Sequence, residues 1–138
     1  MKRFLCLITL IALLVTSLTS CDKRSIDDYK AKFQDHTFTH YKNPDEINDM
    51  ARDLHLNAEE YKVREVLYAH SGNSGVPIGV VIIECGSKSK AEDLGARDAY
   101  VILDYLKTLY STNMYPMTVS VDGKFVLIGT QKTISSIT

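Results

Sequence analysis

The sequence contains no tryptophan, no internal repeat and no long low-complexity tract. It also has no apolar run long enough to cross a membrane. The main apolar run, Phe4–Val15, covers twelve residues, whereas a spanning helix needs about 20. These absences argue against a repeat architecture and against a leader that stays in the membrane as a permanent helix.

The first residues nevertheless have the parts of an export signal. Lys2 and Arg3 form a basic start, Phe4–Val15 is apolar except for Thr9, and Thr16–Ser20 is small and polar. A charged start, a short apolar core and small residues before a processing point are typical of a secretory signal peptide. We therefore expect residues 1–20 to direct export.

The end of this leader carries a more specific motif. Leu18-Thr19-Ser20-Cys21 resembles the lipobox of bacterial lipoproteins. The resemblance implies that the Cys21 sulfur receives a diacylglycerol group, that a peptidase cuts just before Cys21, and that the new N-terminus is acylated again. Such acyl chains would hold the protein on the outer side of a bacterial membrane. In enteric-type bacteria, an aspartate such as Asp22 resembles a signal to stay in the inner membrane. Two alternatives are a secreted protein cut near Ser20 and a buried N-terminal helix.

The remaining 118 residues suffice for one domain with a hydrophobic core. The leader carries two basic and no acidic residues, so the remainder has 14 basic and 17 acidic residues and a formal charge of −3. This charge argues against a nucleic-acid surface. Cys6 leaves with the leader and Cys21 is the expected lipid site, so Cys85 has no partner for an intramolecular disulfide. The domain must therefore be stabilised by packing.

We divide the mature chain into a lipidated N-terminus and tether over residues 21–42 and a small domain over residues 43–138. The tether is polar and mixed in charge, and Ile26, Tyr29 and Phe33 have a loose helical spacing. This spacing predicts about two helical turns before the domain begins.

A helix is predicted to open the domain and to end near residues 55–57. Asn43 suits the N-cap and Pro44 suits the first helical position. Apolar residues then recur at helical spacing, at Ile47, Met50, Ala51 and Leu54.

Two strands are expected next, over residues 60–69 and 76–85. The turn residues of segment 70–75 lie between them, which predicts an antiparallel hairpin. Residues 78–83 are apolar throughout, and such a run is typical of a strand that is covered on both faces. We therefore expect the second strand to be central in the sheet.

The longest predicted helix follows. Ser89–Glu92 has the pattern of a capping box, and the helix should continue to Leu109 or Tyr110. Asp98 falls inside its apolar stripe. Because an unpaired buried carboxylate is costly, we expect Asp98 at the edge of the stripe or paired with Arg97 or another base.

The C-terminal part predicts a second hairpin, with strands Met117–Val121 and Lys124–Gly129 and the turn Asp122-Gly123. Asp-Gly suits a two-residue type I′ turn, which would place Val121 opposite Lys124. One face of this hairpin is almost entirely apolar. The other face carries Phe125 and Leu127, which need cover or a partner, so we take these two residues as a candidate partner surface.

Together these elements predict an α+β fold in the order helix-β-β-α-β-β. The simplest arrangement is a four-stranded, mainly antiparallel sheet with the long helix packed on one face. We expect the helix over residues 44–56 to cover part of the other face.

Three groups of residues have side chains that could take part in metal binding or catalysis. His36 and His40, beside Asp35, would share one side of a helix, but the residues between them favour an extended segment or a loop, so no metal site is expected. The predicted hairpin separates Cys85 from His70, although His55 could still approach the thiol. Nothing in the sequence brings together the acids Glu84, Asp98 and Asp104.

The tyrosines form a further group. They could line a recognition surface, or lie half-buried with the hydroxyl in water, which is the commoner arrangement. The residues are Tyr61, Tyr68, Tyr100, Tyr105, Tyr110 and Tyr115.

The sequence thus favours a membrane-anchored lipoprotein whose domain has a non-enzymatic binding or envelope-accessory role. A protein of the envelope or a small ligand would be its partner, and no catalytic residue, metal or cofactor is assigned. The alternative from another class is a tethered enzyme with a site near Cys85, His55 or Asp98. A third interpretation is a spacer whose sheet is covered on both faces.

Overall fold

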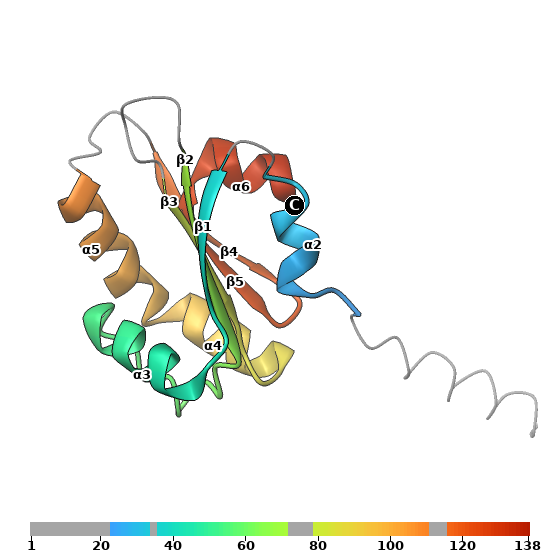
Figure 1. The fold of residues 1–138 in the computed structure, drawn as a ribbon. Coiled ribbons are helices and arrows are strands. Elements are labelled where there is room, and N and C mark those ends of the chain that lie inside the picture. Colours follow the sequence, from blue (N-terminus) through green and yellow to red (C-terminus); the bar gives the residue numbers. More distant parts are fainter. Residues whose placement is uncertain (1–22, 34–35, 72–78, 111–115) are drawn as a thin grey trace, which may run out of the picture.

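The computed structural model describes residues 23–33, 36–71, 79–110 and 116–138 (Figure 1). The leader with Cys21 lies outside these residues, so the lipobox stays a prediction. The elements follow one another as α2 (Ile26–Lys30), β1 (His36–Tyr41), α3 (Pro44–Asp53), β2 (Glu65–Ser71), β3 (Gly79–Glu84), α4 (Lys88–Ala96), α5 (Ala99–Tyr110), β4 (Met117–Asp122), β5 (Phe125–Thr130) and α6 (Gln131–Ile137).

The strands form one antiparallel sheet in the order β1-β2-β3-β5-β4. The predicted α+β class is confirmed, but the sheet has five strands rather than four. The additional strand is β1, which pairs along its whole length with β2, from His36 opposite Ser71 to Tyr41 opposite Val66. The residues of β1 suit extended structure, but the sequence does not show that this segment pairs with β2, to which it is joined only through α3.

The centre of the sheet agrees with the sequence prediction. β2 and β3 are antiparallel neighbours, with Glu65 opposite Glu84 and His70 opposite Gly79. All six residues of β3 are buried. Its unbroken apolar sequence is thus explained by cover on both faces.

The hairpin of β4 and β5 is also present, but its turn was predicted one residue too early. Asp122 pairs with Phe125, and Gly123 and Lys124 form the turn. Gly123 has a φ of 60°, as glycine does at the first central position of a type II′ turn. Val121 therefore lies opposite Val126 instead of Lys124. This shift is two residues along β5, so the side chains remain on the predicted faces.

One face of the sheet is covered by α3, α4 and α5 (Figure 1). These helices and the sheet share one hydrophobic core, which includes Ala51 of α3, Leu94 of α4 and Ile102 of α5. The prediction that the helix over residues 44–56 covers the opposite face from the long helix is therefore wrong.

The opposite face is covered by α2 and α6, which lie on the other side of the sheet in Figure 1. Phe125 and Leu127 are 0% exposed there, and the Tyr29 ring meets the Phe125 ring edge-on at a centroid distance of 5.2 Å. The candidate partner surface at Phe125 and Leu127 is therefore wrong. These residues needed cover, and Ile134 of α6 is part of the core that supplies it.

The segment predicted as a tether contributes to this cover. Ile26 and Tyr29 of α2 are buried, and the Tyr29 hydroxyl donates a hydrogen bond to Asp122 Oδ2 at 2.8 Å. Arg24 forms an ion pair with the same carboxylate. The described domain thus includes α2 and β1, so these two elements are part of the fold rather than of a spacer.

The predicted long helix is two helices, α4 and α5, which meet at Arg97 and Asp98. Its N-cap is Ser87 rather than Ser89, because the Ser87 hydroxyl accepts a hydrogen bond from the Lys90 amide at 3.2 Å. Arg97 at the end of α4 has φ −128° and ψ −88°, which is not helical. The chain therefore changes direction just before Asp98.

Tyr61 lies beneath this break and explains the position of Asp98. The Tyr61 hydroxyl donates to Asp98 Oδ2 at 2.7 Å and accepts from the Arg97 guanidinium at 2.9 Å. Burial, together with the Asp98 carboxylate, raises the pKa of Tyr61 to about 12. The hydrogen-bond partner of Asp98 is therefore the Tyr61 phenol. The Arg97 guanidinium is hydrogen-bonded to the same phenol.

Candidate functional site

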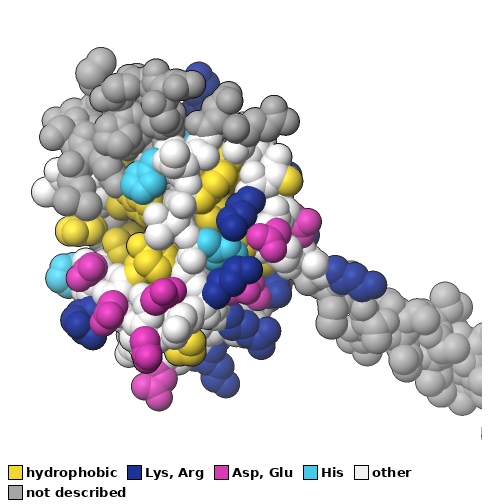
Figure 2. Space-filling view, viewed as in Figure 1, with side chains coloured by type: hydrophobic (Ala, Val, Ile, Leu, Met, Phe, Trp, Pro, Cys, Tyr) yellow, Lys and Arg dark blue, Asp and Glu magenta, His cyan; other side chains and the backbone are white. Residues whose placement is uncertain are grey.

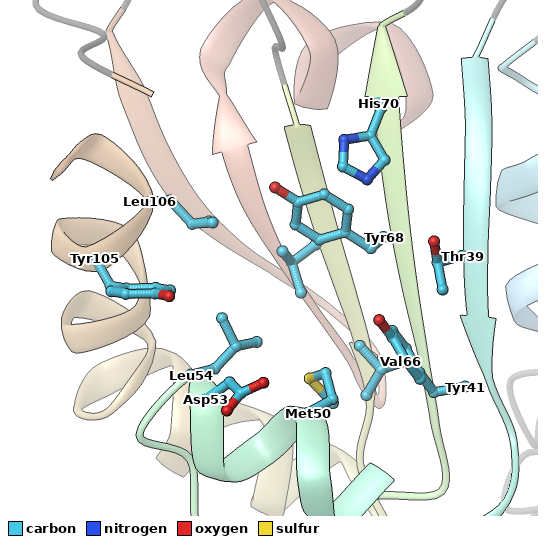
Figure 3. A pocket seen from close by; sticks show the side chains of 11 residues that line it. Thr39, Tyr41, Met50, Asp53, Leu54, Val66, Tyr68, His70, Tyr105 and Leu106 are labelled. Carbon is cyan, nitrogen blue, oxygen red and sulfur yellow. The ribbon is translucent and has the colours of Figure 1, made fainter. Parts of the chain in front are cut away.

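A hollow of about 270 Å³ opens between α3, α5 and the sheet (Figure 3). It lies over β1, β2 and β3, where the helices leave part of the sheet uncovered. Figure 2 shows hydrophobic side chains on this side of the molecule. The described residues that line it are Thr39, Tyr41, Met50, Asp53, Leu54, Val66, Tyr68, His70, Val81, Tyr105 and Leu106.

The floor of the hollow is apolar. Val66 and Val81 are side chains of neighbouring strands and are at most 1% exposed. Leu54 at the end of α3 and Leu106 of α5 form the sides, and Met50 is partly buried against the same core. The floor therefore belongs to the hydrophobic core of this face.

The rim of the hollow is polar and aromatic. Alternation along the strands places Tyr41 of β1 and Tyr68 of β2 on the same face of the sheet, while Tyr105 approaches from α5. In Figure 3 the hydroxyl groups of Tyr41 and Tyr105 point into the space between the helices and the sheet. The Asp53 carboxylate, at the end of α3, points to the same space.

Two histidines contact these tyrosines. The His70 ring lies 4.2 Å from the Tyr68 ring between centroids, and the His55 ring meets the Tyr105 ring edge-on at 6.1 Å. His55 has a φ of 57°, which turns the chain sharply after α3. Tyr68 and Tyr105 thus each have a histidine ring beside them at the rim.

The charge of the hollow is set by one residue. Of the described residues that line it, Asp53 is the one that is charged at neutral pH. Burial lowers the pKa of His70 from its ordinary value of 6.5, so this imidazole is neutral at pH 7. The hollow therefore combines an apolar floor, aromatic walls and a single negative charge at the rim.

Cys85 does not form part of this site. Its side chain is 0% exposed, and burial, with a smaller effect of Glu84, raises the pKa of the thiol to about 12. The sheet register places Cys85 and His70 at opposite ends of the β2–β3 hairpin, as predicted. A thiol in this environment is protonated and inaccessible, so it is unsuited to be a nucleophile.

The histidines of β1 do not form a metal pair. His40 Nε2 lies 2.8 Å from Glu65 Oε2, and the His36 ring packs against the Phe33 ring at a centroid distance of 4.9 Å. Asp35 lies outside the described residues. Among the residues that are described, no group of three or more His, Cys, Asp or Glu side chains is arranged to hold a metal ion.

The candidate acids are separated and have individual partners. Glu84 accepts a hydrogen bond from Lys124 at 2.8 Å, Asp98 from Tyr61 at 2.7 Å, and Asp104 from Lys107 at 3.5 Å. Each carboxylate thus has its own hydrogen-bond partner, and no two of the three form a carboxylate pair for acid–base chemistry.

The hollow itself was not foreseen from the sequence. Tyr68 and Tyr105 were among the tyrosines considered for a recognition surface, and these two do line the hollow. Tyr61 is instead buried and Tyr100 is 53% exposed on α5. Nothing in the sequence indicated that Tyr41 and Asp53 belong to a site. The one local signal is that Asp53 follows Met50 by three residues and so lies next to the apolar stripe of α3.

Comparison of the chain with models of protein families, with curated proteins and with solved structures finds no match. Of the helices in the described part of the chain, none has the length and the apolar character required to span a bilayer.

Proposed function

We propose that the mature protein is a lipid-anchored, extracytoplasmic binding domain that takes a small ligand in the hollow between α3, α5 and the sheet. The observation that carries this proposal is the hollow itself, with an apolar floor and polar side chains that converge at its rim. Ligand sites in proteins commonly have this composition. We assign a non-enzymatic role because, among the described residues that line the hollow, none is a nucleophile hydrogen-bonded to a base.

The position of the proposed anchor is compatible with an open hollow. Ser25 caps α2, so four residue steps separate it from Cys21 and the link is at most about 14 Å long. α2 lies on the face of the sheet opposite the hollow (Figure 1). A lipid on Cys21 would therefore hold the domain close to the membrane from the α2 side, and the hollow would face away from α2.

Anchoring is tested by Cys21→Ser in the full-length protein. We expect the wild type to fractionate with membranes and its mature N-terminus to carry acyl chains by mass spectrometry. The variant should lose the acyl chains and the processing that depends on them. Normal maturation and unchanged membrane association of the variant would contradict the lipid anchor.

Ligand binding is tested by filling the hollow. Thr39 is exposed on β1 and lines the hollow, and Thr37 is exposed on the same strand but does not line it. Aromatic residues are well tolerated in strands, so Thr39→Trp and Thr37→Trp form a matched pair. Native mass spectrometry of protein extracted from membranes should find a small molecule bound to wild type and Thr37→Trp, and not to Thr39→Trp. Equal occupancy of all three, or no bound molecule in any, would contradict the proposal.

A further inference from the structure

The chemistry of the rim narrows the class of ligand. Within the described residues, the side chains of Tyr41, Asp53 and Tyr105 have no hydrogen-bond or ion-pair partner in the protein, yet Figure 3 shows their oxygen atoms directed into the same space. Phenolic and carboxylate oxygens can all accept hydrogen bonds, and the carboxylate can only accept. A ligand group that fits them carries donors or positive charge.

The charge of the rim also favours a cation. Asp53 has no basic neighbour among the described lining residues, so nothing in the lining neutralises its carboxylate. By contrast, the exposed carboxylates of Asp49 on the same helix and of Asp93 on α4 are each paired with an arginine. An anion entering the hollow would meet this unneutralised carboxylate and no basic side chain from the described lining.

The tyrosines contribute oxygen atoms to the same space. Tyr41, Tyr68 and Tyr105 come from three different elements and line one hollow (Figure 3). The hydroxyl oxygens of Tyr41 and Tyr105 point into it and can lie against a cation as acceptors beside the Asp53 carboxylate. A volume of about 270 Å³ is near the lower end of the range for ligand pockets, about 300 Å³. It suits one compact group.

We propose that the hollow binds a small organic cation, with an alkylated ammonium group between the tyrosines and Asp53 and an apolar part on the Val66–Val81 floor. This inference rests on the proposed function, because it names the ligand class of the same site.

The test compares three probes of similar shape and different charge, by calorimetric titration of the full-length protein in non-ionic detergent. The probes are choline, its uncharged isostere neohexyl alcohol, and the anion pivalate. We expect choline to bind about tenfold more tightly than neohexyl alcohol, since the unneutralised Asp53 carboxylate attracts the cation and not its uncharged isostere. Pivalate should bind more weakly than either.

Two variants on α3 test whether Asp53 at the rim causes the preference for choline over neohexyl alcohol. Asp53→Asn should reduce choline affinity about tenfold and leave neohexyl alcohol unchanged, because it removes the charge and keeps the shape. Asp49→Asn removes an exposed carboxylate from the same helix outside the hollow and should change neither affinity. Both positions are exposed, so the variants should remain folded.

Equal affinity for choline and neohexyl alcohol, tighter binding of pivalate, no measurable binding of choline, or an unchanged choline affinity in Asp53→Asn would each overturn the cation proposal. These results are distinguishable from failure of the proposed function. A molecule that is bound in wild type and displaced by Thr39→Trp would still support a ligand site, with a different ligand class.

Discussion

The two faces of the sheet are covered to different extents. On one face, α2 and α6 leave Phe125 and Leu127 fully buried. On the other face, α3, α4 and α5 form a larger core but leave the hollow over β1, β2 and β3. The short helices of the first face complete its core, whereas the incomplete cover of the second face leaves the hollow in which we propose that a ligand binds. Substitutions on the two faces should separate these roles.

The largest difference is expected for Phe125→Ala on the covered face. Loss of a fully buried phenylalanine costs about 3–5 kcal/mol. Tyr105→Ala at the rim of the hollow removes a half-buried ring and should cost about 1 kcal/mol. Urea unfolding of both variants measures the two free energies of unfolding. If Tyr105→Ala were the more damaging change, the assignment of stability to the covered face would be wrong.

A smaller loss is expected when the cover itself is weakened. Ile134 of α6 is 4% exposed and belongs to the core that contains Phe125. Ile134→Ala should lower the free energy of unfolding by about 2–4 kcal/mol. The neighbouring Ser135 is exposed, and Ser135→Ala should change it by less than about 0.5 kcal/mol. Similar small effects of both changes would mean that α6 does not stabilise the fold.

The contacts that attach α2 to the sheet should contribute less to the free energy of unfolding than Ile134 does. Asp122 accepts a hydrogen bond from Tyr29 at 2.8 Å and also pairs with Arg24. Asp122→Asn weakens both contacts and should cost about 1–2 kcal/mol. Asp27→Asn is the control, because Asp27 is exposed and lies 3.7 Å from Lys30. Thermal unfolding would show the difference, and equal melting temperatures would contradict the role of Asp122.

The smallest expected effect is the contribution of His70, on the hollow side of the sheet, to the pH dependence of stability. Burial lowers its pKa in the folded state below 6.5, so the unfolded chain binds a proton more readily than the folded chain. Stability contributed by neutral His70 is therefore complete above pH 6.5 and is lost as the pH falls toward the lowered value. The stability curves of wild type and His70→Gln should differ by a constant amount above this range, and the wild type should decline more steeply below it. Curves that stay parallel through the whole pH range would show that His70 is not desolvated.

Several elements were predictable because their signals are local. Asn43 caps α3 by accepting a hydrogen bond from the Asp45 amide at 3.1 Å, as its position before Pro44 indicated. The apolar run of β3 indicated a central strand, and the alternation in β4 and β5 assigned their side chains to the correct faces. Each of these signals lies within a few neighbouring residues.

Other elements were missed because their stability comes from distant contacts. α6 has seven residues, and its signals are Thr130, which accepts a hydrogen bond from the Thr133 amide at 3.3 Å, and the isoleucines at 134 and 137. β1 is defined by its pairing with β2 rather than by its own composition. Short segments of this kind have weak intrinsic preferences, and tertiary packing determines their structure.

The sequence alone determined the class of fold, the central hairpin and the two faces of the last hairpin, because periodicity and turn residues act over short distances. It also predicts a lipid anchor at Cys21, through the resemblance of Leu18-Thr19-Ser20-Cys21 to a lipobox. Only the tertiary structure decided that Phe125 and Leu127 are covered and that Tyr41, Asp53 and Tyr105 meet around one hollow. Those outcomes depend on which helix packs on which face, and this is a property of the whole chain.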